Sequence, residues 1–167
     1  MAAALALWPA QAPAETVPVT GTVVAGGLSV RSPLGALAVP RLHAVKAGWR
    51  QAVVRVPVTV VDARGSGAGW ALSMSASTRT ASGGRAPGLR VSVWKMQVRC
   101  AGCTRPRVRS VLPQALPEQT PVRAFAAARQ SGMGTMRVVA RLLVTAPVTM
   151  PRGPYVLRAT VSRVAGP

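Results

Sequence analysis

The stretch of sequence that decides the fold lies between Val53 and Ser77 and reads VVRVPVTVVDARGSGAGWALSMSAS. In its first part every second residue from Val54 to Val60 is valine, and Arg55 and Pro57 lie on the opposite face. Apolar residues at alternate positions of a β-branched run predict a β-strand with one buried face. Pro57 has no N–H to donate to a neighbouring strand, so we expect a sheet edge or a bulge there.

A turn and a second strand follow this first strand. Residues 62–69 contain three glycines, which predict a turn. Beyond it, the large apolar residues Trp70, Leu72 and Met74 alternate with Ala and Ser. The alternation predicts a strand with a buried face and a polar outer face. The two strands would form either a hairpin or a crossover between two sheets.

The same alternation continues through the rest of the chain. Further strands are expected at Val17–Ala25, Gly27–Val30, Leu89–Val98, Met136–Val144 and Tyr155–Val161. The apolar phase shifts after Val93, which predicts a β-bulge. The sequence contains no convincing amphipathic helix, and Val122–Gln130 is the best short candidate. Many short strands separated by turns predict an all-β, antiparallel, Ig-like β-sandwich that forms a single domain over residues 15–167.

The composition limits the chemistry that the protein can perform. The 167 residues include 21 Lys and Arg against three Asp and Glu, which gives a formal net charge of +18, and 49% are hydrophobic. That hydrophobic fraction is too high for a disordered chain. The acids are Glu15, Asp62 and Glu118, and His43 is the only histidine. Acid–base catalysis and metal binding depend on these residue types, so we expect no enzyme activity, no cofactor and no metal.

Basic residues are concentrated in the second half of the chain. Residues 84–167 hold 14 of the 21, and the densest cluster is Arg99, Arg105, Arg107 and Arg109. A surface with so few acids suits contact with a polyanion, and this cluster is the first candidate for that contact. The alternative is that these arginines occupy ordinary solvated positions.

The N-terminus has the features of an export signal. Ala2–Trp8 is a short apolar run, and Ala12-Pro13-Ala14 supplies the small residues of a cleavage site. No Lys or Arg precedes the apolar run, as expected if the signal is truncated. With residues 1–14 removed, no apolar run reaches the ~20 residues that a transmembrane helix needs. The mature chain is therefore expected to be secreted.

Two cysteines fit this expectation. Cys100 and Cys103 lie in a loop between two strand-like runs, and in a secreted protein such a pair favours a disulfide. Free thiols are the first alternative. A redox or zinc site is the second, although zinc needs four ligands and the chain has no second cysteine pair.

A family resemblance is carried by the same central stretch. Val60–Ser77, with Asp62-x-Arg64-Gly65 before Trp70-Ala71-Leu72, resembles the WxL domain of bacterial cell-surface proteins. Two later blocks agree in order: Ala126–Thr135 is similar to the family's Gly-Met-Gly block, and Gly153–Thr160 to its closing strand. The family usually has a second Trp-x-Leu where this chain has Tyr155-Val156-Leu157, and residues 85–113 have no counterpart.

The resemblance implies a function on the outside of the cell. WxL domains associate non-covalently with peptidoglycan, often beside other surface proteins, and the resemblance makes Trp70, Leu72, Tyr155 and Leu157 candidate wall-binding residues. Their alternative role is core packing, since large aromatic residues usually fill a sandwich. Asp62 and Arg64 would either clamp the turn or present Arg64 to a wall carboxylate or phosphate. Trp49 and Trp94, beside basic residues, are either buried or exposed to a carbohydrate or polyanion.

Three classes of function remain. The first is an exported, non-catalytic domain that binds peptidoglycan or an anionic wall polymer. The second is a structural or interaction subunit of a filament, coat or adhesin, whose partners are other surface proteins or further copies of this chain. The third is a nucleic-acid binder, which the export signal disfavours, so we expect no specific nucleic-acid partner.

Overall fold

The structure is a computed structural model that describes residues 26–32, 36–46, 48–86, 88–100, 102–106 and 112–165. Within these residues the chain forms strands and no helix. The strands are β1 (Leu28–Arg31), β2 (Ala36–Ala38), β3 (His43–Lys46), β4 (Trp49–Asp62), β5 (Trp70–Thr80), β6 (Arg90–Cys100), β7 (Gln114–Ala115), β8 (Val122–Ala127), β9 (Gly134–Pro147) and β10 (Tyr155–Ala165). The expected signal peptide, residues 1–14, and the expected strand Val17–Ala25 lie outside the described residues.

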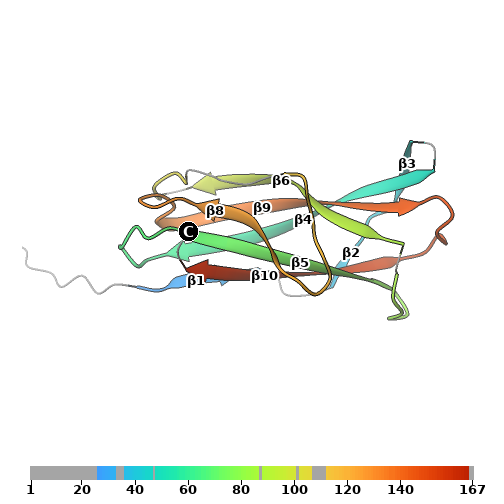
Figure 1. Cartoon of the computed structure of the whole chain (residues 1–167), viewed down its shortest axis with the longest axis horizontal. Helices are drawn as coiled ribbons and strands as arrows, with labels where there is room; N and C mark the ends of the chain where they lie inside the picture. The colour runs from blue at the N-terminus through green and yellow to red at the C-terminus, as the bar shows by residue number, and fades with distance from the viewer. Residues whose placement is uncertain are drawn as a thin grey trace, which may run out of the picture.

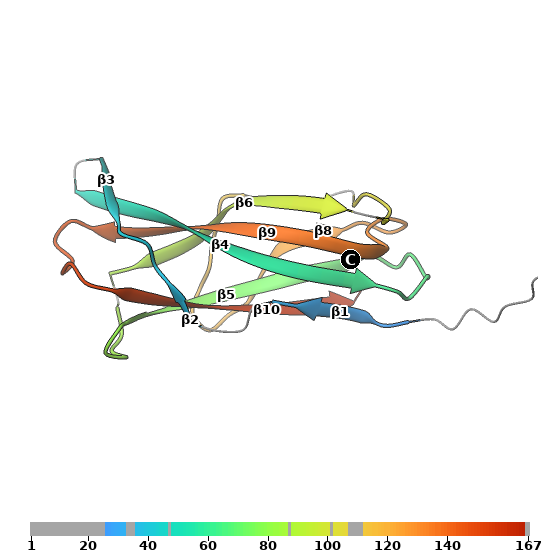
Figure 2. The same cartoon turned by 180° about the vertical axis from the view of Figure 1, so that it is seen from behind.

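The strands form two antiparallel sheets that run along the long axis of the molecule (Figures 1 and 2). The six-stranded sheet has the order β1-β4-β9-β6-β7, with β3 also paired to β4, and the four-stranded sheet has the order β2-β10-β5-β8. This confirms the prediction of an all-β, antiparallel fold. Since β4 and β5 belong to different sheets, the turn between them is a crossover and not a hairpin.

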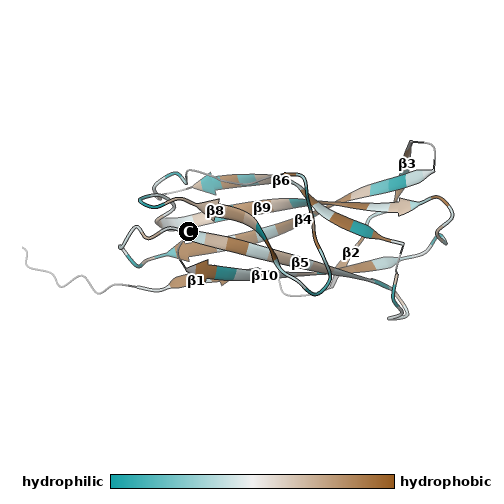
Figure 3. Ribbon diagram, viewed as in Figure 1, coloured by the Kyte–Doolittle hydropathy of each residue, from teal (hydrophilic) through white to brown (hydrophobic). Residues whose placement is uncertain are grey.

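One hydrophobic core lies between the two sheets. The alternate valines of β4 and the alternate apolar residues of β9 are buried, as their period of two predicts. Hydrophobic residues alternate with polar ones along the strands in Figure 3. β5 departs from the expected polar outer face, because Ala71 and Ser75 are buried there as well. Both residues have small side chains on a strand that is paired on its two sides, to β10 and β8.

The best short candidate for a helix, Val122–Gln130, is not helical, because the structure has strand β8 at Val122–Ala127. Residues 124–127 are all buried, and β8 takes its backbone hydrogen bonds from the edge of β5. Alanine has the highest intrinsic helix propensity, but the preference amounts to less than about 1 kcal/mol per residue. A vacant sheet edge over a hydrophobic core outweighs that preference.

The bulge expected in β6 is confirmed. The register between β6 and β9 shifts between Val93 and Lys95. Val93 is fully buried, whereas Trp94 in the bulge is 48% exposed. The extra residue keeps the apolar side chains of both halves of β6 directed toward the core and turns Trp94 and Lys95 to the outside.

The N-terminal strands cross between the two sheets along one side of the molecule. β1 pairs with Thr59–Asp62 of β4, β2 with Val156–Arg158 of β10, and β3 with Trp49–Gln51 of β4. Among the described residues, the segment of β4 from Ala52 to Val58 therefore has a partner only on its β9 side. Pro57 lies in this open segment, which agrees with the sheet edge expected from the sequence.

Candidate polyanion-binding face

The crossover between β4 and β5 is held by the Asp62–Arg64 pair. Arg64 donates from Nε to Oδ1 and from Nη2 to Oδ2 of Asp62, both at 2.9 Å, and from Nη2 to the Gly69 carbonyl at 2.7 Å. The hydrogen bond from the Arg64 side chain lowers the pKa of the Asp62 carboxyl below its ordinary value of 3.8. The same pairing raises the pKa of Arg64. The Arg64 guanidinium therefore makes its hydrogen bonds within the turn.

The Trp-x-Leu and Gly-Met-Gly blocks meet at the same end of the molecule. Trp70 is fully buried, donates from Nε1 to the Gly132 carbonyl at 2.9 Å and stacks on Phe125 with ring centroids 5.3 Å apart. A Cβ at Gly132 would lie 2.7 Å from the Ala127 Cβ and 2.9 Å from Trp70 Nε1. Gly132 is therefore required by the close approach of the indole ring.

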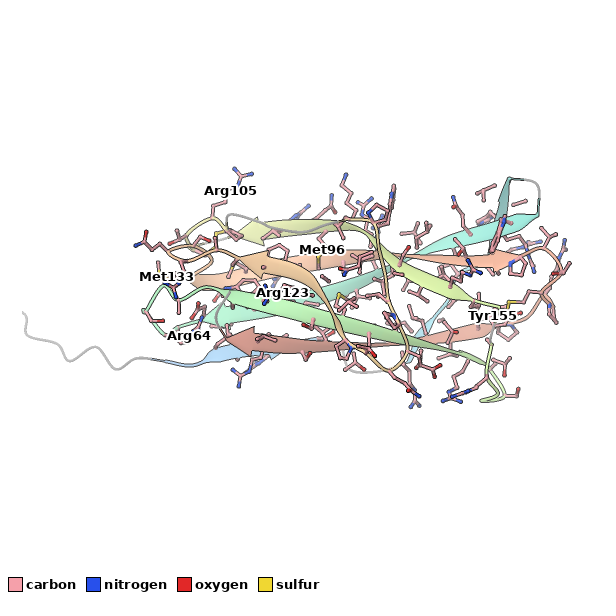
Figure 4. All side chains as sticks on the ribbon, in the orientation of Figure 1. Arg64, Met96, Arg105, Arg123, Met133 and Tyr155 are labelled. Carbon is pink, nitrogen blue, oxygen red and sulfur yellow. A yellow bond between two sulfur atoms is a disulfide. The ribbon has the colours of Figure 1, made fainter. Side chains whose placement is uncertain are left out.

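None of the four motif side chains is presented to a ligand. Trp70, Leu72 and Leu157 are fully buried, and Tyr155 is 6% exposed with its hydroxyl donating to the Pro151 carbonyl. The two Trp-x-Leu-like sites also lie far apart, because Arg64 and Met133 are at one end of the molecule and Tyr155 is at the other (Figure 4). Core packing, one of the two alternatives for these residues, is what the structure contains.

Cys100 and Cys103 form a disulfide with their Cα atoms 5.6 Å apart. The loop that follows is tied to the Gly-Met-Gly block by hydrogen bonds from Thr104 N to the Met133 carbonyl and from Gly132 N to the Thr104 carbonyl. Arg99 and Arg105 are exposed, and Arg105 projects away from the sheets in Figure 4. Arg107 and Arg109 lie outside the described residues. The expected four-residue cluster is thus described only at Arg99 and Arg105.

A larger concentration of charge covers the outer face of the six-stranded sheet. Register pairing places Arg55, Arg141 and Lys95 side by side on β4, β9 and β6. A second row, four residues further along β9, contains Arg137 beside Arg99, and Arg31 beyond Thr59. Adjacent strands lie about 4.8 Å apart, and four residues along a strand span about 13 Å. The cationic face is defined here as Arg31, Arg55, Arg90, Lys95, Arg99, Arg137 and Arg141.

No acid lies on the cationic face among the described residues. Asp62 is buried and bonded to Arg64, and Glu118 lies 3.9 Å from Arg79 of the four-stranded sheet. Within the face, Arg141 donates to the Gln97 side chain at 3.1 Å. Like charges directly opposite on neighbouring strands repel one another. The face therefore has a positive potential that no described side chain offsets.

Two tryptophans accompany these cations. Trp49 is 39% exposed and Trp94 is 48% exposed, so both adopt the exposed alternative. The Arg90 guanidinium lies 5.6 Å from the centre of the Trp49 ring. Cations beside exposed indole rings can bind phosphates and sugar rings together.

Sequence reasoning missed this face because its rows depend on the pairing register of strands far apart in the chain. A partial signal was present in Arg137 and Arg141, which occupy outward positions of a strand with apolar inward ones.

Two further findings concern the part of the chain that the structure describes. It contains no group of three or more metal-ligating side chains. No helix there is long and apolar enough to span a membrane.

Comparison with known proteins does not assign the chain to a family. No family model, no curated protein and no solved structure matches the chain.

Proposed function

We propose that this protein is a non-catalytic, secreted cell-surface domain that binds an anionic polymer of the bacterial cell wall through the cationic face. The observation that carries this proposal is the row of Arg55, Arg141 and Lys95 on three neighbouring strands, with no acid on the same face in the described part of the chain. A cationic surface of this kind binds polyanions through salt-sensitive contacts. The exposed Trp49 and Trp94 would add contacts with the sugar units of such a polymer.

The family relationship belongs to the same proposal. We infer an Ig-like β-sandwich related to the WxL domain, on the ordered blocks around Trp70, Gly132 and Tyr155. In this chain those blocks are buried and hold the fold together. The surface that they support, and not the motif side chains, would then contact the wall.

The test is co-sedimentation of the purified chain with cell-wall sacculi, before and after chemical removal of their phosphate polymers. The decisive variant is Arg55→Gln/Lys95→Gln/Arg141→Gln. The matched control is Arg123→Gln/Arg158→Gln/Arg163→Gln, which removes the same charge from exposed positions of the four-stranded sheet. We expect the wild type and the control to pellet with untreated sacculi and the first variant to remain in the supernatant.

Two results would overturn the proposal. One is a wild-type chain that stays in the supernatant at low salt. The other is equal loss of binding in both triple variants, because binding would then depend on net charge and not on this face. Retention on DNA would not by itself support a nucleic-acid function, since any chain of this charge binds DNA non-specifically.

A second candidate function is that of a subunit in an extracellular assembly. The observation in its favour is the open segment of β4 from Ala52 to Val58, which among the described residues has no partner strand on one side and could pair with an added strand there. Negative-stain microscopy at increasing protein concentration tests it. Ordered polymers would support this candidate, and a monomer at all concentrations would exclude self-assembly.

A further inference from the structure

A second positively charged feature lies at the end of the molecule that contains Tyr155. A cavity of about 540 Å³ opens there between the segment Val39–Ala44 and the start of β10. Arg41, Arg50 and Arg152 are among the residues that line it, together with His43. No acid is among the described residues that line it.

Arg50 is the unusual member of this group, because it lies on the inward face of β4, where the alternate valines follow. Arg50 is only 8% exposed. Its Nη2 donates to the carbonyls of Pro147 and Met150, and at 3.5 Å to that of Val148. These bonds fasten the turn between β9 and β10. The Nε–H of Arg50 is buried and has no hydrogen-bond partner.

The charge of Arg50 also has no described counter-ion. Asp62 lies twelve residues further along β4 than Arg50, which corresponds to about 40 Å, and it is paired with Arg64. Glu118 lies beside Arg79. Carbonyl dipoles satisfy hydrogen bonds but do not neutralise a buried cation, and a buried charge without an opposite charge is costly.

We propose that this cavity is a binding site for a single phosphate group, with Arg50 at its base and Arg41 and Arg152 at its rim. The anion would neutralise the guanidinium of Arg50, which is among the residues that line the cavity. Three arginines at one cavity suit phosphate better than a carboxylate, because phosphate carries more charge and more acceptor oxygens. The site is independent of the cationic face and of the proposed wall binding.

The experiment is an NMR titration of the full chain with inorganic phosphate and with dimethyl phosphate, at ionic strength held constant with sodium chloride. We expect saturable shifts at the amides of Ala44, Gly153 and Tyr155. Arg41→Gln/Arg152→Gln is expected to weaken binding about tenfold. Arg158→Gln/Arg163→Gln, which removes the same charge elsewhere, is expected to change it less than about twofold.

Arg50→Lys tests the base of the cavity while keeping the charge. It is expected to weaken binding because Lys lacks the planar guanidinium group of Arg. The rim variant tests the site even if this variant does not fold. Binding of both ligands would assign phosphodiesters of a polymer, and binding of inorganic phosphate alone would assign a free or terminal phosphate. Shifts spread over all surface arginines, or equal affinity in the rim variant and its control, would overturn the proposal.

Discussion

At the scale of single residues, the Asp62–Arg64 pair holds the crossover from one sheet to the other. The Asp62 carboxylate accepts three hydrogen bonds from Arg64, and Asp62→Asn removes its charge, so we expect the free energy of unfolding to fall by about 2 kcal/mol at pH 7. The pKa of Asp62 is lowered in the folded state. Its contribution is therefore complete above the ordinary value of 3.8 and is lost as the pH falls through the folded-state pKa.

Urea unfolding at pH 7, 5 and 3 checks this prediction. The difference between the wild type and Asp62→Asn should narrow at the lowest pH. Glu118→Gln is the control, because both side chains of the Arg79–Glu118 pair are 42% exposed, and such pairs contribute less than about 1 kcal/mol. A difference that is the same at all three pH values would contradict the role of the Asp62 charge.

Gly132 is the residue on which the Trp70 ring depends. Gly132→Ala places a Cβ within 3 Å of both Ala127 and Trp70, at a φ of +72°. Gly65→Ala is the matched control, since Gly65 has a φ of +67° and open space around the new Cβ. We expect Gly132→Ala to cost about 2 kcal/mol more than the control, because only there must the core move. Denaturant unfolding followed by tryptophan fluorescence measures both, and equal losses would show that packing at Trp70 is loose.

At the scale of elements, the open segment of β4 needs protection against unwanted pairing. Arg55 places a charge there, and Pro57 has no N–H for an added strand. Both features are typical of edge strands that avoid aggregation. The neighbouring residues are mostly valine, which otherwise favours intermolecular β-structure.

Arg55→Val/Pro57→Val should therefore aggregate with a shorter lag time than the wild type, measured by light scattering and thioflavin T fluorescence. The control is Arg137→Val/Thr145→Val, which removes the same charge from β9, a strand paired on both sides. We expect the control to remain soluble. Similar aggregation of both variants would assign the effect to lost charge and not to the open edge.

At the scale of the whole molecule, the net charge of +18 has a cost in stability. Crowded arginines on the cationic face repel one another, and salt screens that repulsion. We expect the Tm of the wild type to rise by roughly 3 °C between 20 and 300 mM sodium chloride, which corresponds to about 1 kcal/mol. Arg55→Gln/Lys95→Gln/Arg141→Gln should respond less to salt than the matched triple variant of the four-stranded sheet. A steeper response in the cationic-face variant would contradict the prediction.

The sequence by itself determined the long strands β4, β5, β6, β9 and β10, the buried faces of β4 and β9, the bulge after Val93 and the pairing of the two cysteines. These features follow from local rules, because side chains alternate along any extended chain and an inserted residue shifts that alternation. The burial of Trp70 and Tyr155 stayed ambiguous, since an aromatic residue on a strand packs equally well in a core or on a sugar.

Only the tertiary structure decided which residues meet. Arg55, Lys95 and Arg141 are separated by up to 86 positions in the chain, and their common row exists because β4, β9 and β6 pair in one register. The same long-range pairing made Val122–Ala127 a strand and buried Arg50 beneath the turn between β9 and β10. Register depends on hydrogen bonds and packing between distant segments, and no local pattern of residues contains that information.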